Sequence, residues 1–363
     1  MGMKVLSLPV DFGGCGFYRV RKPLDGLNRY TEADCHVIDY SKDDMKEIIK
    51  AIASADFIFM RPGAEVGMAK IRAIPELSKI KAKWIMDIDD NTDLISPYNE
   101  FYRSYGVKNY NHDKIEVWKD GVKGFSIKEN KERVNSLKIG LRSADIVTTT
   151  TEKLAEHARK YNKNVYVNDN TIDTDHWWTL NNSGNEPLRV VWAGSPSHYA
   201  DWYDIKEPLE RLMSVYNFEV IMLGSQYTGI FKKEYLPRVK ALPWVPFESH
   251  SYRMMALQGD IGIIPLADEP FNLYKSAIKH YENMSMGLPS VVSNVGPYTE
   301  SLIEGVTGLG YKTPDEFYIQ MKKLLDSSLL RKQIAKSGRK WLDENKTLEL
   351  ESKRLYKYLS EQL

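Results

Sequence analysis

The stretch from Ile261 to Ser293 constrains the fold of this chain more than any other part of its sequence. It reads IGIIPLADEPFNLYKSAIKHYENMSMGLPSVVS. A short apolar run is followed by a polar loop, by a helical stretch that opens near Asn272, and by a second apolar run after a Gly-Leu-Pro stop. The pattern predicts one unit of strand, loop, helix and strand.

Five polar side chains recur at spacings of three and four in the helical stretch, which puts them on one face of a helix. Backbone amides at a helix start attract anions, and two lysines beside them reinforce that attraction. Such a stripe suits a ligand with phosphates at one end and hydroxyls at the other, such as a nucleotide sugar. The alternative is a solvated helix face with intrahelical ion pairs. The five residues are Asn272, Lys275, Ser276, Lys279 and Glu282.

Further units of the same kind fill the rest of the chain, where apolar runs alternate with amphipathic stretches such as 42–54 and 64–81. Repeated units predict parallel sheets covered on both faces, with ligands at the carboxyl ends of the strands. At 363 residues the chain is long for one core, so two domains are expected. The strand candidates are 4–10, 35–38, 57–60, 84–88, 146–149, 165–167, 188–192, 218–223, 239–244, 261–266, 290–293 and 307–311.

Composition narrows the class of protein. Only two cysteines, Cys15 and Cys35, occur, so neither a disulfide framework nor a zinc cluster is expected. No stretch approaches the roughly 18 apolar residues of a membrane-spanning helix. We therefore expect a soluble, cytoplasmic protein without an integral membrane segment. The net charge of +1 does not by itself exclude nucleic acid, because a basic patch can hide in a balanced total.

Two loops at predicted strand ends carry candidate ligand contacts. The first, DFGGCG over 11–16, lets backbone approach a ligand closely at Gly13 and Gly14, and a tight turn without a ligand is the alternative. The second, DIDDN over 87–91, contains Asp89 and Asp90. Three interpretations of these carboxylates are open: a metal site, a capping turn, or a partner or base for an acceptor hydroxyl.

A long irregular excursion is expected near 91–130. Between 101 and 142, ten Lys or Arg stand against five Asp or Glu. Cations meet phosphates and rings stack on bases or sugars, so this segment suits a nucleic acid or a glycan. The alternative is an excursion that packs over the N-terminal domain. The aromatic residues are Tyr102, Tyr105, Tyr110, Trp118 and Phe125.

The spacing of Glu282, Gly287 and Pro289 resembles the donor-binding signature of the retaining glycosyltransferases of the GT-B fold, of the family-four (glycosyl transferases group 1) type. In that signature a glutamate lies five residues before a Gly-x-Pro stop. The family places another glutamate eight residues earlier, where this sequence has Tyr274. A neighbouring polar residue, Asn272 or Lys275, is expected to take over that sugar contact.

The segment VYVNDNTIDTDHWW over 165–178 is similar to the family's linker, with Asn170, Asp173 and Trp177 in the same order, and a polar joint follows at 181–186. The resemblance implies an α/β protein of the GT-B fold, with two Rossmann-like, doubly wound domains facing each other across a cleft. The implied parts are an acceptor-side domain over 1–178, a nucleotide-sugar-binding domain over 179–340, and a helix over 341–363 that crosses back to the N-terminal domain.

The resemblance also implies a donor site. The family places a glycine, an arginine and a lysine where this chain has AGSPSHY over 193–199, so Ser195 replaces the arginine and no lysine follows until Lys206. His198 and the two lysines of the stripe are expected to bind the diphosphate instead, unless His198 is a surface turn residue. Val245, at a strand end, is expected to hold the base through its backbone. The predicted donor-binding residues are Gly13, Gly14, Gly194, Ser195, Ser197, Val245, Asn272, Lys275, Ser276, Lys279 and Glu282.

The implied activity is transfer of a hexose, expected to be glucose from UDP-glucose, to an acceptor hydroxyl with retention and without a metal or other cofactor. Asp89, Asp90 and His198 are the candidate catalytic residues, and Glu282 is expected to hold the ribose. The expected acceptor is a glycan or a hydroxymethylated DNA base of the kind that phage glucosyltransferases modify. The alternative is a catalytically inert nucleotide-sugar-binding module.

Overall fold

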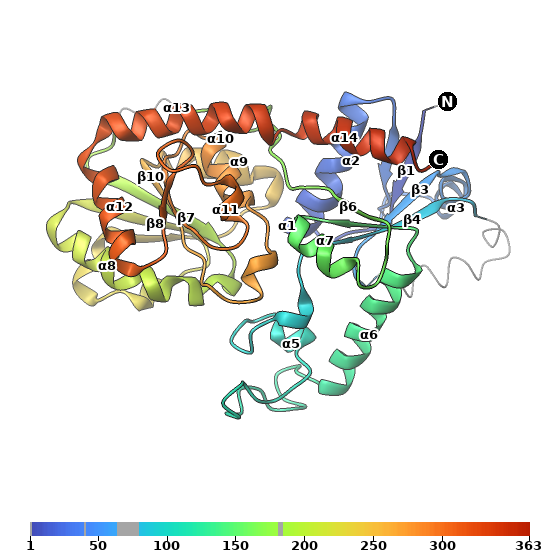
Figure 1. Ribbon diagram of the computed structural model, residues 1–363, viewed down its shortest axis with the longest axis horizontal. Helices are drawn as coiled ribbons and strands as arrows, with labels where there is room; N and C mark the ends of the chain where they lie inside the picture. Colours follow the sequence, from blue (N-terminus) through green and yellow to red (C-terminus); the bar gives the residue numbers. More distant parts are fainter. Residues whose placement is uncertain (1, 40, 64–79, 181–183) are drawn as a thin grey trace.

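The computed structural model describes residues 2–39, 41–63, 80–180 and 184–363, and it contains two parallel sheets of six strands each. Figure 1 shows the two sheets side by side, each covered by helices. The first sheet has the strand order β2-β1-β3-β4-β5-β6. Its strands are β1 (Lys4–Ser7), β2 (Asp34–Val37), β3 (Phe57–Met60), β4 (Lys83–Ile88), β5 (Ile146–Thr149) and β6 (Val165–Val167).

The second sheet has the order β12-β11-β10-β7-β8-β9, so its first strand, β7, lies at the centre. In a doubly wound sheet of this order, ligands bind outside the carboxyl ends of the strands, where the order reverses. The α/β fold with two domains, predicted from the sequence, is confirmed. The strands are β7 (Leu188–Gly194), β8 (Phe218–Gly224), β9 (Val239–Leu242), β10 (Ile261–Ile264), β11 (Ser290–Ser293) and β12 (Leu309–Tyr311).

Helices cover both faces of the sheets, and for this reason a strand such as β3 is buried along its whole length and reads as an unbroken apolar run. Two predicted segments lie partly outside the described residues: most of the amphipathic stretch over 64–81, and half of the polar joint over 181–186. The described α-helices are α1 (Gly14–Gly16), α2 (Lys22–Tyr30), α3 (Met45–Ser54), α5 (Tyr102–Tyr105), α6 (Ile127–Ser143), α7 (Glu152–Ala158), α8 (Tyr203–Val215), α9 (Phe247–Ala256), α10 (Ile278–Ser285), α11 (Tyr298–Ser301), α12 (Pro314–Asp326), α13 (Ser328–Asn345) and α14 (Leu348–Ser360).

The excursion before α6 is ordered around an aromatic cluster of its own. Tyr102 and Phe125 stack at 6.1 Å, and Trp118 lies 5.4 Å from Phe125. Phe271 of the C-terminal domain joins the same cluster. Figure 1 shows this segment projecting beyond the N-terminal sheet. Four of the five rings expected to be available for stacking on a ligand therefore belong to this cluster, because Tyr105 also packs against it, whereas Tyr110 is 52% exposed.

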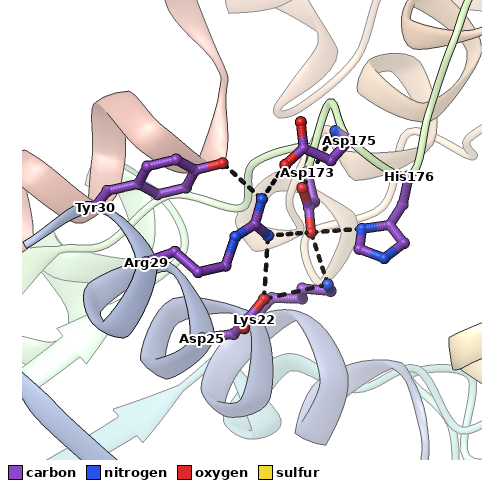
Figure 2. Close-up of polar contacts among 7 residues, drawn as sticks. All are labelled: Lys22, Asp25, Arg29, Tyr30, Asp173, Asp175 and His176. Carbon is purple, nitrogen blue, oxygen red and sulfur yellow. Dashed lines mark hydrogen bonds and ion pairs between the residues drawn. The ribbon is translucent and has the colours of Figure 1, made fainter.

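An ionic cluster joins the linker between the domains to α2. Figure 2 shows Lys22 and Arg29 converging on Asp173, whose Oδ2 lies 2.7 Å from the Lys22 ammonium and 2.9 Å from the Arg29 guanidinium. His176 Nδ1 lies 2.7 Å from the same oxygen, and Arg29 also pairs with Asp175. These contacts fix the linker on the N-terminal domain.

The chain returns to the N-terminal domain between α13 and α14. There the amide of Ile172 donates to the carbonyl of Lys346 at 3.0 Å, and the amide of Leu348 donates to the carbonyl of Ile172 at 2.8 Å. The helix α14 then packs on α2, where a side chain at Gly26 would overlap Ser352. The linker that leaves the N-terminal domain and the segment that returns to it thus lie side by side.

Within the described ranges, no helix has the length and apolar character needed to span a membrane.

Candidate active site

A cleft of about 790 Å³ lies between the two domains, at the carboxyl ends of the strands of both sheets. It brings together every sequence-predicted site residue except Val245 and Asn272. The neighbours Trp244 and Phe247 line the cleft instead of Val245, and the side-chain amide of Asn272 donates to the carbonyl of Ala267 at 2.9 Å. The predicted residues in the lining are Gly13, Gly14, Asp89, Asp90, Gly194, Ser195, Ser197, His198, Lys275, Ser276, Lys279 and Glu282.

The predicted helix start near Asn272 is wrong. Residues Asn272–Tyr274 form one 3-10 turn, Lys275 is extended (φ −69°, ψ 167°), and α10 begins at Ile278. Lys279 and Glu282 therefore share a helix face, whereas Lys275 and Ser276 approach the cleft from the loop before it. The expected helix stop is present at Gly287, whose φ of +67° favours glycine.

The Lys279 ammonium is the most unusual group in the cleft. Its Nζ is buried without a hydrogen-bond partner in the described part of the chain and lies 5.5 Å from the centre of the Trp192 ring. Burial lowers its pKa to about 7, helped by the charge of Lys275 and opposed by Asp201 and Glu282. Gly194 makes room for it, because a Cβ there would lie 2.4 Å from Trp192 and 3.0 Å from the Lys279 Nζ. The site thus presents a partly desolvated cation.

The glycine-rich loop after β1 approaches the C-terminal domain. A Cβ at Gly14 would lie 2.9 Å from the Phe247 ring. The amide of Gly13 donates to the Asp11 carboxylate at 2.7 Å, so this amide already has a partner. The close approach to Phe247 explains the glycine at position 14, whereas a side chain at Gly13 or Gly16 would meet Asp11 of the loop itself.

His198 forms a dyad with Asp201, which sequence reasoning missed. Nδ1 lies 2.6 Å from Asp201 Oδ2, and Asp201 Oδ1 accepts the Ala267 amide at 2.9 Å. Burial, helped by the charges of Lys279 and Lys275 and opposed by Asp201, lowers the pKa of His198 to about 3. The imidazole is therefore neutral near pH 7, and its Nδ1 proton is donated to Asp201. His198 suits a hydroxyl partner better than the diphosphate expected from the sequence.

Glu282 is buried, and its Oε1 has two protein partners. The Tyr18 hydroxyl donates to it at 2.5 Å across the cleft, and His250 Nε2 lies 3.3 Å away. Burial and the Glu282 charge raise the pKa of Tyr18 well above its usual value. Both partners escaped the sequence analysis, because Tyr18 follows the glycine-rich loop in another domain and His250 lies in α9.

Two neighbouring carboxylates after β4 differ in their surroundings. Arg61 binds Asp89 at 2.8 Å and Asp87 at 2.6 Å, and Arg19 also binds Asp87. The pKa of Asp89 is lowered because, although burial opposes it, the Arg61 charge and the hydrogen bonds of Cys15 and Arg61 favour the anion. No residue in the described ranges binds the Asp90 carboxylate.

Burial and the Asp89 charge raise the pKa of Asp90 to about 6, while Lys275 and Arg61 act in the opposite direction. Asp90 is therefore the carboxylate that is free to meet a ligand. Nowhere in the described ranges do three or more His, Cys, Asp or Glu side chains form a group that could hold a metal ion.

Two Rossmann-like domains with the carboxyl ends of their sheets facing one cleft define the GT-B fold of glycosyltransferases. Residues 241–341 match the family model described as Glycosyl transferases group 1. The match runs from within β9 to within α13 and includes α10 with Lys279 and Glu282. Together, the fold and this match indicate a glycosyltransferase.

Solved structures resemble the chain over its whole length. HepE from Anabaena in complex with UDP superposes with a TM-score of 0.64 at 13% identity, covering 99% of this chain and 100% of that one. A sucrose-phosphate synthase from Thermosynechococcus elongatus gives 0.64 at 14%, with the same coverage. A glycosyltransferase from Rickettsia africae gives 0.61 at 12%, covering 99% and 98%. Comparison with curated proteins found no significant sequence match.

Proposed function

We propose that this protein transfers glucose from UDP-glucose to a hydroxyl of a glycan, with retention at the anomeric carbon. One observation carries the proposal: the buried Lys279 ammonium, without a hydrogen-bond partner in the described ranges, lies one helical turn before Glu282 in the cleft. A buried cation without a partner calls for an anionic ligand, because an isolated buried charge is costly. The carboxylate one turn later suits hydroxyl groups.

In this proposal the donor spans the cleft. Its diphosphate binds Lys275 and Lys279, its ribose hydroxyls bind the free oxygen of Glu282, and its base lies beside Trp244 at the end of β9. Crystal structures of the similar HepE contain UDP and UDP-glucose, which supports this nucleotide. Cations at the diphosphate stabilise the charge that the leaving group gains in the transition state.

The transfer breaks the bond between the anomeric carbon and the diphosphate oxygen and forms a bond from the acceptor oxygen to the same carbon. The acceptor hydroxyl loses its proton in this step. Asp90, with a pKa of about 6 and no protein partner in the described ranges, accepts that proton. His198 Nε2 accepts a hydrogen bond from a sugar hydroxyl. Retention rests on the resemblance of Glu282, Gly287 and Pro289 to the signature of retaining enzymes.

We take a glycan as the acceptor because it is the usual acceptor of the glycosyltransferases that the chain resembles. The rings Tyr102, Trp118 and Phe125 of the excursion are packed on one another, so they offer no stacking surface to a base or to a sugar. The exposed lysines of the excursion remain a reason to test DNA, because cations contribute most of the affinity for nucleic acid.

The proposal is tested by incubating the protein with UDP-glucose, alone, with mixed bacterial glycans, and with hydroxymethylated DNA, while UDP release is measured. We expect release stimulated by a glycan and an α-linked product in the proton NMR spectrum. Stimulation by the DNA instead would identify a DNA glucosyltransferase. Donor binding without release under all conditions would identify an inert binding module.

Two variants test the assignment of the site by calorimetry with UDP and with pyrophosphate. Lys279→Ala is expected to weaken both ligands by about tenfold, because both carry the diphosphate charge. Glu282→Ala is expected to weaken UDP but not pyrophosphate, which has no ribose. Lys322→Ala, an exposed lysine on α12, is the control. Unchanged UDP affinity in the first two variants would refute this placement.

A further inference from the structure

Three tyrosines form a row that begins in the cleft and continues onto the surface of the C-terminal domain. Tyr227 lines the cleft, its ring lies 5.4 Å from that of Tyr199, and the Tyr199 ring lies 5.8 Å from that of Tyr203. Tyr199 is 49% exposed and Tyr203 is 70% exposed. A contiguous exposed aromatic patch that continues from a binding site marks an interaction surface.

The tyrosine row (Tyr227, Tyr199 and Tyr203) is anchored at its cleft end by the contacts of Tyr227. The Tyr227 hydroxyl donates to the carbonyl of Ser195 at 3.0 Å. Its ring packs 5.4 Å from buried Trp192 and 6.4 Å from buried Trp202. A surface that is ordered before binding loses little conformational entropy when a ligand arrives.

The excursion of the N-terminal domain reaches the same mouth of the cleft. Phe101 lines the cleft and is 51% exposed. Burial raises the pKa of Tyr227, and the charges of Asp201 and Glu100 raise it further, so Glu100 lies near the row. A ligand on the tyrosine row therefore enters the cleft beside Phe101 of the N-terminal domain and Tyr227 of the C-terminal domain.

We propose that the tyrosine row is an acceptor subsite for a neutral oligosaccharide chain. The proposal rests on the glycosyltransferase function and names the class of its acceptor. Tyrosine rings pack against the C–H faces of pyranose units, while the tyrosine hydroxyls bond to sugar hydroxyls. A nucleic acid needs cations along its path. Near Tyr203, Lys206 is offset by exposed Asp204 and Glu207.

The experiment measures calorimetric binding of maltohexaose, cellohexaose and chitohexaose in the presence of saturating UDP. The variant is the double substitution Tyr199→Ala with Tyr203→Ala. The control is Tyr252→Ala, a tyrosine of α9 that is 48% exposed and contacts Trp178. We expect the parent and the control to bind at least one hexasaccharide, and the double variant to bind it about tenfold more weakly. UDP affinity and the melting temperature should stay unchanged in all three proteins.

Two results would overturn the subsite: no hexasaccharide binds the parent, or the double variant binds as tightly as the parent. Binding of oligothymidine that is lost in the double variant, without saccharide binding, also overturns it and reassigns the row to single-stranded nucleic acid. If the parent does not bind UDP, the proposed function itself is contradicted. Because UDP affinity is measured separately, failure of the subsite and failure of the function are distinguishable.

Discussion

The hydroxyl of Tyr18 donates a 2.5 Å hydrogen bond to Oε1 of Glu282, a residue 264 positions further along the chain. Tyr18 lies in a π-helix (Phe17–Arg21) of the N-terminal domain, and Glu282 lies in α10 of the C-terminal domain. His250 contacts the same oxygen. These partners satisfy Oε1 and leave Oε2 without a protein partner in the described ranges. The contact thus orients, from the opposite domain, the carboxylate that we propose binds the donor.

Removal of the Tyr18 hydroxyl should weaken donor binding. In Tyr18→Phe, Glu282 loses one of the two groups that orient it, and loss of one hydrogen bond corresponds to about 1 kcal/mol. We expect UDP to bind about fivefold more weakly by calorimetry, and Tyr252→Phe to leave the affinity unchanged. Tighter UDP binding would contradict this expectation and would show that Tyr18 competes with the ribose.

UDP affinity should fall as the pH rises above about 7. The pKa of Lys279 is lowered to about 7 in the free protein. A bound diphosphate favours the ammonium and raises this pKa, so binding near pH 8 takes up a proton. Calorimetry at pH 8 in buffers of different ionisation enthalpy should detect the uptake. Lys279→Arg keeps its charge at this pH and should bind UDP without the uptake; equal uptake in both proteins would exclude Lys279 as its source.

Asp90→Asn should reduce kcat by about 100-fold or more, because an amide cannot accept the acceptor proton. In the parent at saturating donor, kcat should rise as the pH passes through about 6, where Asp90 loses its proton, and then level off. The variant should lack this rise. UDP affinity, measured by calorimetry, should stay within about twofold of the parent. A variant that keeps both the rate and the pH profile would exclude Asp90 as the base.

Asp173→Ala should destabilise the protein by about 2 kcal/mol, because Lys22 and Arg29 lose the carboxylate on which they converge (Figure 2). Asp25→Ala is the matched control, since Asp25 contacts the same two cations but is 44% exposed. Its effect should be below about 0.5 kcal/mol. Urea unfolding at pH 7 measures both. Equal effects of the two substitutions would exclude a special role for the linker carboxylate.

The same carboxylate should add to the acid sensitivity of the fold. Although burial opposes the shift, hydrogen bonds and charge from Lys22 and Arg29 lower the pKa of Asp173 to about 2. Its folded pKa lies below the unfolded value near 3.8, so its contribution is complete above about pH 4. That contribution is lost as the pH falls through about 2. Urea unfolding from pH 5 to pH 2 should therefore show a smaller loss of stability in Asp173→Ala than in the parent.

Local pattern was enough to predict most of the framework. The apolar run 57–60 coincides with β3, because a strand covered on both faces favours apolar residues throughout, and 290–293 coincides with β11, where buried Ser290 and Ser293 flank two valines. The helix stop at Gly287 was equally local, since it depends on one left-handed backbone position. The start of α10 was missed because the spacing of polar residues continues through the 3-10 turn before it.

What the sequence by itself determined was the class of fold and the side chains offered at the strand ends, because these depend on residues close together in the chain. The tertiary structure alone decided which of them are free to act. Asp89 is bound by Arg61 and Asp90 is not, and burial beside Lys279 and Lys275 keeps His198 neutral. Tyr18 meets Glu282 only because two domains close on one cleft. Burial and charge at such contacts come from partners far away in sequence, which no local spacing encodes.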